Sequence, residues 1–284
     1  SIKTFLKHPI KDSSNRSANP AVIRASTILF DSMQELYQHE KKIKKHQKVS
    51  HYSYGRYGSS TTIELENILK ELEQAFHVFL TGTGFGGVAL AIMSICRPGD
   101  EILVSDNVYG PTKEISEKLL KEFDINAKFY DPNSFYDLKT KVTKKTKMIL
   151  VENPGSNTFE FQDLSKIVNL AKKKKIFTFL DNTWGTPLYL KPLKLGFDMS
   201  FSSATKYFSG HSDAMGGSLA VNKKVFKQVM FFYKLSGYRM SADEAYLIIR
   251  GLRTLDTRLN QHYENTKQII NFLKKQKKVK EILY

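Results

Sequence analysis

Cysteine is almost absent from this sequence, which has a single one, Cys96, among 284 residues. One thiol excludes an intrachain disulfide framework and any zinc site built from cysteines, and it suits a reducing compartment. No stretch approaches the ~20 consecutive apolar residues of a membrane-spanning helix. The opening residues have no apolar segment of the kind that a secretory signal needs. We therefore expect a soluble, cytoplasmic protein with no membrane partner.

Acidic residues are fewer than basic ones, with 28 Asp and Glu against 44 Lys and Arg, so the formal net charge is +16. Such a balance is typical of nucleic-acid-binding proteins. Here the lysines gather in four separate runs, 41–48, 139–147, 172–175 and 274–280. Neither arginine nor aromatic residues are interleaved with them, as a base-stacking surface requires. We interpret the runs as solvated surface and expect no nucleic-acid partner, while a non-enzymatic basic binding protein stays an alternative hypothesis.

The rest of the composition is that of a globular protein, 41% hydrophobic and 25% charged. Residues 1–55 are polar and irregular, and we interpret them as an N-terminal arm with at most one helix. From about residue 60, apolar strands alternate with amphipathic helices. Strands are predicted at 78–80, 101–105, 126–130, 148–151, 176–180, 199–202 and 218–221. This alternation predicts an α/β fold, with a mainly parallel sheet flanked by helices on both faces.

Three helix predictions are specific enough to test. Thr61 and Glu64 match the capping box that opens an amphipathic helix. Asp163 is predicted to cap a helix that runs through 175. A further helix is predicted over 112–123, with these apolar residues facing inward: Ile115, Leu119, Leu120 and Phe123.

A glycine-rich turn follows the first predicted strand. Gly82, Gly84 and Gly87 match the G-x-G-x-x-G dinucleotide fingerprint, and Asp106 ends the next strand, where a ribose-binding acid is expected. An NAD(P)-dependent oxidoreductase is therefore the main competing hypothesis. The narrower inference is an anion site at Gly84 and Phe85, where amide groups at a helix N-terminus would face a phosphate.

Other strand ends carry groups that a dinucleotide site does not require. They are Tyr109, the run 152–157, Asp181, and Lys206 preceded by Ser203 and Thr205. Ligands of parallel sheets bind beyond the carboxyl ends of the strands, so these groups should converge on one site. Pyridoxal 5'-phosphate (PLP) needs a lysine for a Schiff base, an acid facing its pyridine nitrogen and a phosphate site. The pattern therefore favours PLP over NAD(P), and no metal site is expected.

Six motifs resemble, in the same order, those of the Cys/Met-metabolism family of fold-type I PLP enzymes. They are Tyr54-Gly-Arg56, Val108-Tyr-Gly-Pro111, Glu152-Asn-Pro-Gly-Ser-Asn157, Asp181-Asn-Thr-Trp184, Ser203-Ala-Thr-Lys-Tyr-Phe-Ser-Gly-His-Ser-Asp-Ala-Met-Gly-Gly217 and Arg250-Gly-Leu-Arg-Thr-Leu255. The resemblance covers nearly the whole chain. Within the family, the Pro-Gly-Ser form of the third motif, the run 211–215 and the motif 250–255 favour a β-lyase over γ-lyases and γ-synthases.

The resemblance implies a role for each matching residue. Lys206 would hold PLP as a Schiff base and take the Cα proton, Asp181 would pair with the pyridine nitrogen, and Asn157 would contact the 3′-oxygen. Tyr109 would stack on the ring and, like Tyr54, could move protons. The phosphate would be bound by Gly84, Phe85, Ser203 and Thr205, although the family often has a smaller residue or Met at the position of Phe85.

The resemblance also implies an assembly, because Tyr54 and Arg56 belong to a segment that reaches the cofactor of the partner subunit. A homodimer or homotetramer is therefore expected. The implied domains are an N-terminal arm at 1–55, a PLP-binding domain at 56–255 and the start of a C-terminal domain at 256–284, truncated here. We expect the arginine that binds the substrate α-carboxylate to lie beyond Tyr284, because no arginine follows Arg258.

The implied activity is that of a PLP-dependent carbon–sulfur β-lyase of methionine biosynthesis and transsulfuration. Such an enzyme cleaves L-cystathionine to homocysteine, pyruvate and ammonia. Alternatives within the family are γ-lyase, γ-synthase, cysteine or cystine lyase, and alanine racemase as a side activity.

Overall fold

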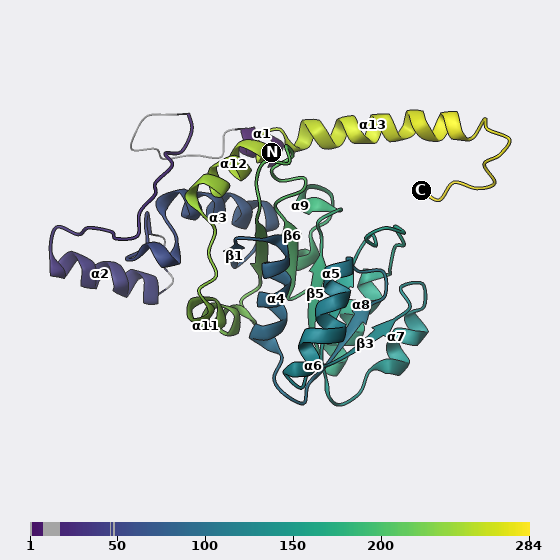
Figure 1. The fold of residues 1–284 in the computed structure, drawn as a ribbon, viewed down its shortest axis with the longest axis horizontal. Coiled ribbons are helices and arrows are strands. Elements are labelled where there is room, and N and C mark those ends of the chain that lie inside the picture. The colour runs from purple at the N-terminus through teal and green to yellow at the C-terminus, as the bar shows by residue number, and fades with distance from the viewer. Residues whose placement is uncertain (1, 8–17, 46, 48) are drawn as a thin grey trace.

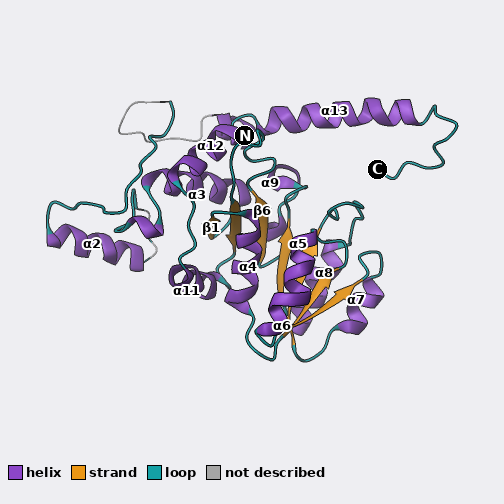
Figure 2. Cartoon of the chain, in the orientation of Figure 1, coloured by secondary structure: helices purple, strands orange, loops and turns teal. Residues whose placement is uncertain are grey.

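One sheet organises the molecule. The computed structural model describes residues 2–7, 18–45, 47 and 49–284, and within them seven strands pair in the order β1-β7-β6-β5-β4-β2-β3. Figure 2 shows the strands in orange, with helices packed around them. The strands are β1 His77–Thr81, β2 Glu101–Ser105, β3 Asn126–Tyr130, β4 Thr146–Glu152, β5 Phe177–Asp181, β6 Met199–Ser203 and β7 Gly217–Val221. Pairing is parallel from β6 through β3, while β7 runs antiparallel to β6 and to β1. The predicted α/β fold with a mainly parallel sheet is confirmed.

The strands form because both of their faces are buried. Every residue of β2 and of β7 is buried, as expected for strands covered on both sides. Successive side chains point to opposite faces, so Leu150 of β4 packs into one core cluster while its neighbours Ile149 and Val151 pack into another. Helices must therefore cover both faces of the sheet.

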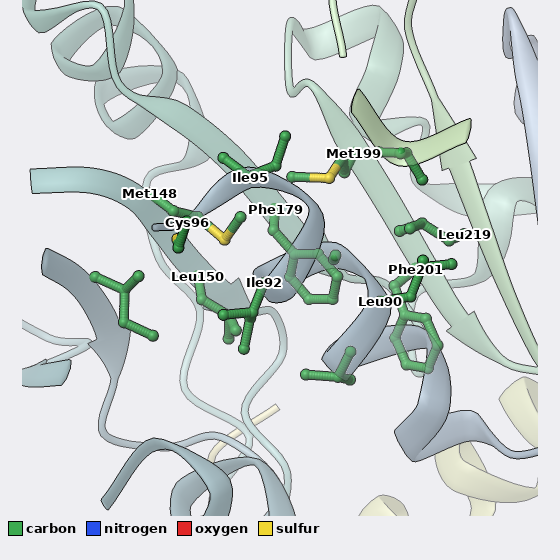
Figure 3. Packing of buried hydrophobic residues seen from close by; sticks show 14 of the residues in the cluster. Leu90, Ile92, Ile95, Cys96, Met148, Leu150, Phe179, Met199, Phe201 and Leu219 are labelled. Atoms are coloured by element: carbon green, nitrogen blue, oxygen red, sulfur yellow. The ribbon is translucent and has the colours of Figure 1, made fainter. Parts of the chain in front are cut away.

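The first face is covered mainly by α4 (Gly84–Ile95) and α11 (Phe226–Ser236). Side chains of α4, among them Leu90 and Ile92, pack on Leu150, Phe179 and other strand residues (Figure 3). The opposite face is covered by α3 (Ser60–Glu73) and α12 (Ala242–Leu252) beside β1 and β7, and by α7 (Phe135–Lys141) and α8 (Leu164–Lys174) beside β4 and β5. The two layers of helices support the sheet, and the site lies at the carboxyl ends of its strands.

The remaining helices connect or extend this core. They are α1 (Ile2–Lys7), α2 (Met33–Lys44), α5 (Gly110–Glu114), α6 (Leu120–Glu122), α9 (Thr186–Tyr189), α10 (Pro192–Leu195) and α13 (Leu255–Leu273). The first turns of α13 pack on the body through Leu255 and Leu259, and the helix then runs out past it (Figure 1). None of the described helices is both long and apolar enough to cross a membrane.

The N-terminal arm has more helix than predicted. Its described residues form two helices, α1 and α2, so the expectation of at most one helix is wrong. The short α1 is stabilised by tertiary packing, because Leu6 is buried in the cluster shared by α3 and α12. A segment of six residues is too short to show helical periodicity. The arm residues 1, 8–17, 46 and 48, including one lysine of the run 41–48, lie outside the described part.

Two local predictions for helices also need correction. Helix α3 begins earlier than predicted, and its capping box is formed by Ser59 and Thr62 rather than by Thr61 and Glu64. Thr61 instead joins α3 to the arm, since its Oγ1 donates to Ala21 O and accepts from Ile23 N. The prediction that Asp163 caps α8 is confirmed by its bond from Lys166 N.

The segment predicted as one helix over 112–123 contains a π-helical turn at Ile115–Leu119 between α5 and α6. The wider turn rotates the helix face, so Ile115 and Leu120 are buried while Leu119 and Phe123 are about half exposed. The inward orientation predicted for Leu119 and Phe123 is therefore wrong.

Candidate active site

A cavity of about 700 Å³ opens where β4, β5 and β6 end. Its volume is that of a cofactor-sized site. Most of the site residues predicted from the sequence line it: Gly84, Phe85, Tyr109, Asn157, Asp181, Ser203, Thr205 and Lys206. They come from separate elements, and the parallel strands bring them to one edge of the sheet.

Two buried carboxyl groups lie on the cavity floor. Glu152 and Asp181 end β4 and β5 and are paired in the strand register. Asp181 Oδ1 accepts from Thr183 N at 3.0 Å, and Glu152 Oε2 accepts from Tyr109 N at 2.7 Å. Burial raises the pKa of Asp181, and burial together with the charge of Asp181 raises the pKa of Glu152 further. The pair therefore favours one negative charge, which a cation in the cavity would fix on Asp181.

The glycine turn after β1 becomes the N-terminus of α4. Thr83 caps this helix, its Oγ1 accepting from Gly86 N at 3.0 Å, and Gly84 and Phe85 of the first turn line the cavity. A Cβ on Gly84 would lie 2.5 Å from Ser203 Oγ, so glycine leaves the room between the helix and β6. Free amides, a helix dipole and hydroxyls at one place make an anion site.

Lys206 follows β6 in a tight turn. Its amide donates to Ser203 O at 3.1 Å, and its carbonyl accepts from Gly210 N at 2.8 Å. Thr205 Oγ1 accepts from Gly216 N at 3.1 Å and donates to Gly216 O at 3.3 Å, which ties the turn to the residue that precedes β7. Across the described residues no ion pair of the Lys206 ammonium is found. The amine therefore faces the cavity without a fixed partner.

Tyr54 and Arg56 do not line this cavity. Tyr54 pairs with Thr27 in an isolated bridge and is 45% exposed. Arg56 Nη1 donates to Lys234 O at 3.3 Å, and its guanidinium lies over the ring of Tyr57. The two residues are thus presented on the surface of the protomer.

The dinucleotide interpretation of the glycine turn is wrong. In a dinucleotide fold the second strand lies next to the first, so its acid reaches the same ligand. Here β1 is at one edge of the sheet and β2 lies near the other edge. Asp106, at the end of β2, forms an ion pair with Lys113 at 2.5 Å and lines a different hollow. Gly87 serves packing, since a Cβ there would lie 2.6 Å from the Phe201 ring.

Several cavity residues received no role from the sequence. Glu152 lay in a recognised motif, but its contact with Tyr109 depends on the strand order. Trp184, Tyr207 and His262 of α13 line the cavity as a row of rings, and Phe159 packs on Trp184 outside the lining; neighbouring ring centroids are 4.9 to 5.9 Å apart. Trp184 and Tyr207 belonged to motifs whose other members pointed to the site, whereas Phe159 and His262 belonged to none.

Comparison with known proteins supports a PLP-binding site in this cavity. The family model described as Cys/Met metabolism PLP-dependent enzyme matches residues 4–284. Cystathionine beta-lyase of Bordetella avium is 34% identical over 98% of this chain and 71% of its own length. The L-alanine/L-glutamate racemase of Wolbachia pipientis wMel is 33% identical over 94% of this chain and 67% of its own length. The chain spans about two thirds of the length of these curated relatives.

Solved structures agree on the fold. The crystal structure of cystathionine gamma synthase from Xanthomonas oryzae pv. oryzae in complex with cystathionine has a TM-score of 0.88 and 29% identity, over 98% of this chain and 69% of that one. That of metB from Corynebacterium glutamicum has a TM-score of 0.89 and 26% identity, over the whole of this chain and 71% of that one.

The cavity fits PLP on its own chemistry. Asp181 is a buried acid without a cationic partner in the described structure, Gly84 leaves an anion cradle beside Ser203, and Lys206 brings a primary amine between them. These are the three anchors that a pyridine nitrogen, a phosphate and an aldehyde require. The match over 4–284, the relatives and the site agree, and the chain belongs to the Cys/Met-metabolism family of PLP-dependent enzymes.

Proposed function

We propose that this chain is a PLP-dependent carbon–sulfur β-lyase that cleaves L-cystathionine, with water, to homocysteine, pyruvate and ammonia. The observation that carries the proposal is the single cavity that unites Lys206, Asp181 and the N-terminus of α4. The choice of cystathionine is supported by the names of relatives, such as the cystathionine beta-lyase of Bordetella avium.

Each anchor has its own task in this proposal. PLP, when bound, supplies a ring that withdraws electrons from the Cα atom of an amino acid. The Lys206 Nζ holds the cofactor covalently and, once released by the substrate amine, moves the Cα proton. Asp181, ionised beside a cationic ring nitrogen, keeps the proton on that nitrogen. Glu152 holds the backbone of Tyr109, whose ring covers the cofactor.

The phosphate and the 3′-oxygen orient the cofactor. Gly84 and Phe85 would donate backbone amides to the phosphate, and Ser203 and Thr205 would donate their hydroxyl groups, that of Thr205 in place of its present bond to Gly216 O. Asn157 contacts the 3′-oxygen. The side chain of Phe85, 40% exposed at the cavity, leaves its amide available.

The proposal includes an assembly and a location. Tyr54 and Arg56, which lie on the surface of their own protomer, complete the site of a partner subunit in a homodimer or homotetramer, with Tyr54 assisting proton transfer. Residues 56–255 form the PLP-binding domain, with an arm at 1–55 and the start of a further domain at 256–284. The enzyme works in the cytoplasm.

A product assay tests the activity. The protein is incubated with PLP and L-cystathionine, with the Lys206→Ala variant as the matched control. Pyruvate and homocysteine from the parent alone are expected. Formation of 2-oxobutyrate and cysteine would overturn the β-lyase assignment in favour of a γ-lyase. Product from Lys206→Ala at the parent rate would overturn the role of the lysine.

Racemisation is the second candidate activity, favoured by the 33% identity to the L-alanine/L-glutamate racemase of Wolbachia pipientis wMel. It uses the same proton transfer at Cα without loss of a thiolate. Conversion of L-alanine to D-alanine, with no pyruvate from L-cystathionine, would replace the lyase by a racemase.

A further inference from the structure

The motif Arg250–Leu255 has no role in the proposed chemistry, yet it touches the turn that carries Lys206. It spans the end of α12 and the start of α13. A Cβ on Gly251 would lie 2.2 Å from both Phe208 O and Ser209 O. Only glycine permits this approach, so the helix junction packs directly on the backbone that follows Lys206.

Arg258, one turn into α13, joins the junction to the same turn. Its Nη2 donates to Tyr207 O at 2.7 Å and to Gly251 O at 2.9 Å, and its Nε donates to Thr254 Oγ1 at 3.0 Å. The guanidinium lies flat against Gly210, where a Cβ would be 2.4 Å from Cζ. The peptide next to Lys206 is thus bonded to a helix that begins some fifty residues later in the chain.

Arg258 differs from a surface arginine in what it contacts. Within the described residues no carboxylate forms an ion pair with it, and its hydrogen bonds there go to two backbone carbonyls and one hydroxyl. Burial lowers its pKa, and no acidic neighbour opposes that effect. The planar guanidinium group contacts three acceptors at once, and the ammonium group of a lysine cannot reproduce this geometry.

We infer that Arg258, with Gly251 and Thr254, is a positioning device that holds the Lys206 turn at the cavity, so that the lysine amine and Thr205 meet PLP together. The inference rests on the proposed function, because it assumes that Lys206 holds the cofactor. Arg258 also lines the cavity, but its hydrogen bonds go to the backbone of Tyr207 and Gly251 and to the hydroxyl of Thr254, so its role is to position the turn rather than to take part in catalysis.

The test uses Arg258→Lys in the full chain, with PLP affinity and covalent attachment as readouts. The dissociation constant for PLP is expected to rise about tenfold, the loss expected when charge-assisted hydrogen bonds are removed. Borohydride reduction followed by mass spectrometry should show a smaller fraction of Lys206 labelled. Both are measured at a temperature at which circular dichroism shows parent and variant equally folded. Parent-like affinity and labelling in Arg258→Lys would overturn the inference.

Two further variants keep the outcome interpretable. Arg253→Lys is the matched control, because Arg253 also donates to a backbone carbonyl, Ala18 O, but in the arm. It should bind PLP as the parent does, and an equal loss in Arg253→Lys would overturn the inference. Thr254→Val removes the hydroxyl that accepts from Arg258 Nε and donates to Gly251 O, and it is the deciding variant if Arg258→Lys does not fold. A loss of PLP affinity smaller than tenfold supports the inference, and no loss overturns it. Failure of the parent to label at Lys206 would instead refute the proposed function.

Discussion

Two carboxyl groups at neighbouring strand ends, Glu152 and Asp181, accept hydrogen bonds from different backbone amides. Glu152 accepts the amide of Tyr109, and Asp181 accepts the amide of Thr183. Burial raises both pKa values, and the mutual repulsion falls mainly on Glu152. A neutral Glu152 beside an ionised Asp181 would therefore present one negative charge to a protonated ring nitrogen, as the proposed function requires.

Asp181→Asn is expected to leave the fold intact and to slow exchange of the substrate Cα proton into D₂O by about 10²-fold or more. The physical reason is that a neutral amide does not keep a proton on the ring nitrogen, so the electron sink weakens. Proton exchange of a bound amino acid, followed by NMR, measures the effect. Asp106→Asn, an exposed acid at another strand end, is the control and should exchange at the parent rate. Equal rates for Asp181→Asn and the parent would refute the role.

Individual residues were predictable where the strand-end rule applies to them directly. Asp181 and Lys206 each follow an apolar strand, so the sequence places them at the cavity. Arg258 was not predictable, because its contact with Tyr207 O joins a helix to a turn through tertiary packing. The proposed action of Tyr54 and Arg56 on a partner subunit stays a prediction.

At the scale of elements, α3 contains a buried carboxyl group with consequences for stability. Glu66 accepts the Tyr52 hydroxyl at 2.8 Å, and burial raises the pKa of Glu66 from 4.5 to about 8. Between these two pH values the folded state keeps a proton that the unfolded state loses. The free energy of unfolding therefore falls as pH rises from about 4.5 to about 8, by at most about 1.4 kcal/mol per pH unit from this group.

Glu66→Gln should remove this contribution, because glutamine does not titrate and its amide oxygen still accepts from Tyr52. Urea unfolding at pH 5 and pH 8 is the measurement, and the loss of stability between them should be smaller in the variant than in the parent. Glu71→Gln, on the exposed face of α3, should keep the parental difference. The same pH dependence in Glu66→Gln and the parent would contradict the buried, protonated state.

The bounds of two strands were predicted as the structure has them, 101–105 for β2 and 126–130 for β3. Strand β2 is buried throughout, which matches its apolar run, whereas only the last residue of β3, Tyr130, is buried. The orientation of Leu119 and Phe123 failed because a π-helical turn adds a residue that periodicity does not show. No sequence pattern predicted that β1 pairs with β7, because the strand order depends on how the whole chain folds.

For the whole molecule, mixing two damaged variants tests whether sites are shared between subunits. Arg56→Ala and Lys206→Ala should each be inactive on L-cystathionine. Unfolded together and refolded in equal amounts, they should regain about a quarter of the parent activity, because half of the dimers are mixed and each has one intact site. Activity that stays at the level of the separate variants would refute the shared site.

The pairing of β1 with β7 has a consequence for how the protein is made. The glycine turn that would cradle the phosphate follows β1, which is among the first strands to leave the ribosome. Within the described residues β1 pairs in the sheet with β7 alone, which begins at Gly217 and emerges much later. Until then β2 to β6 can assemble, while β1 lacks its sheet partner and must close a very long loop. If the glycine turn binds the phosphate as proposed, cofactor capture would be a late event in biosynthesis, and a nascent chain that ends before β7 would depend on chaperones.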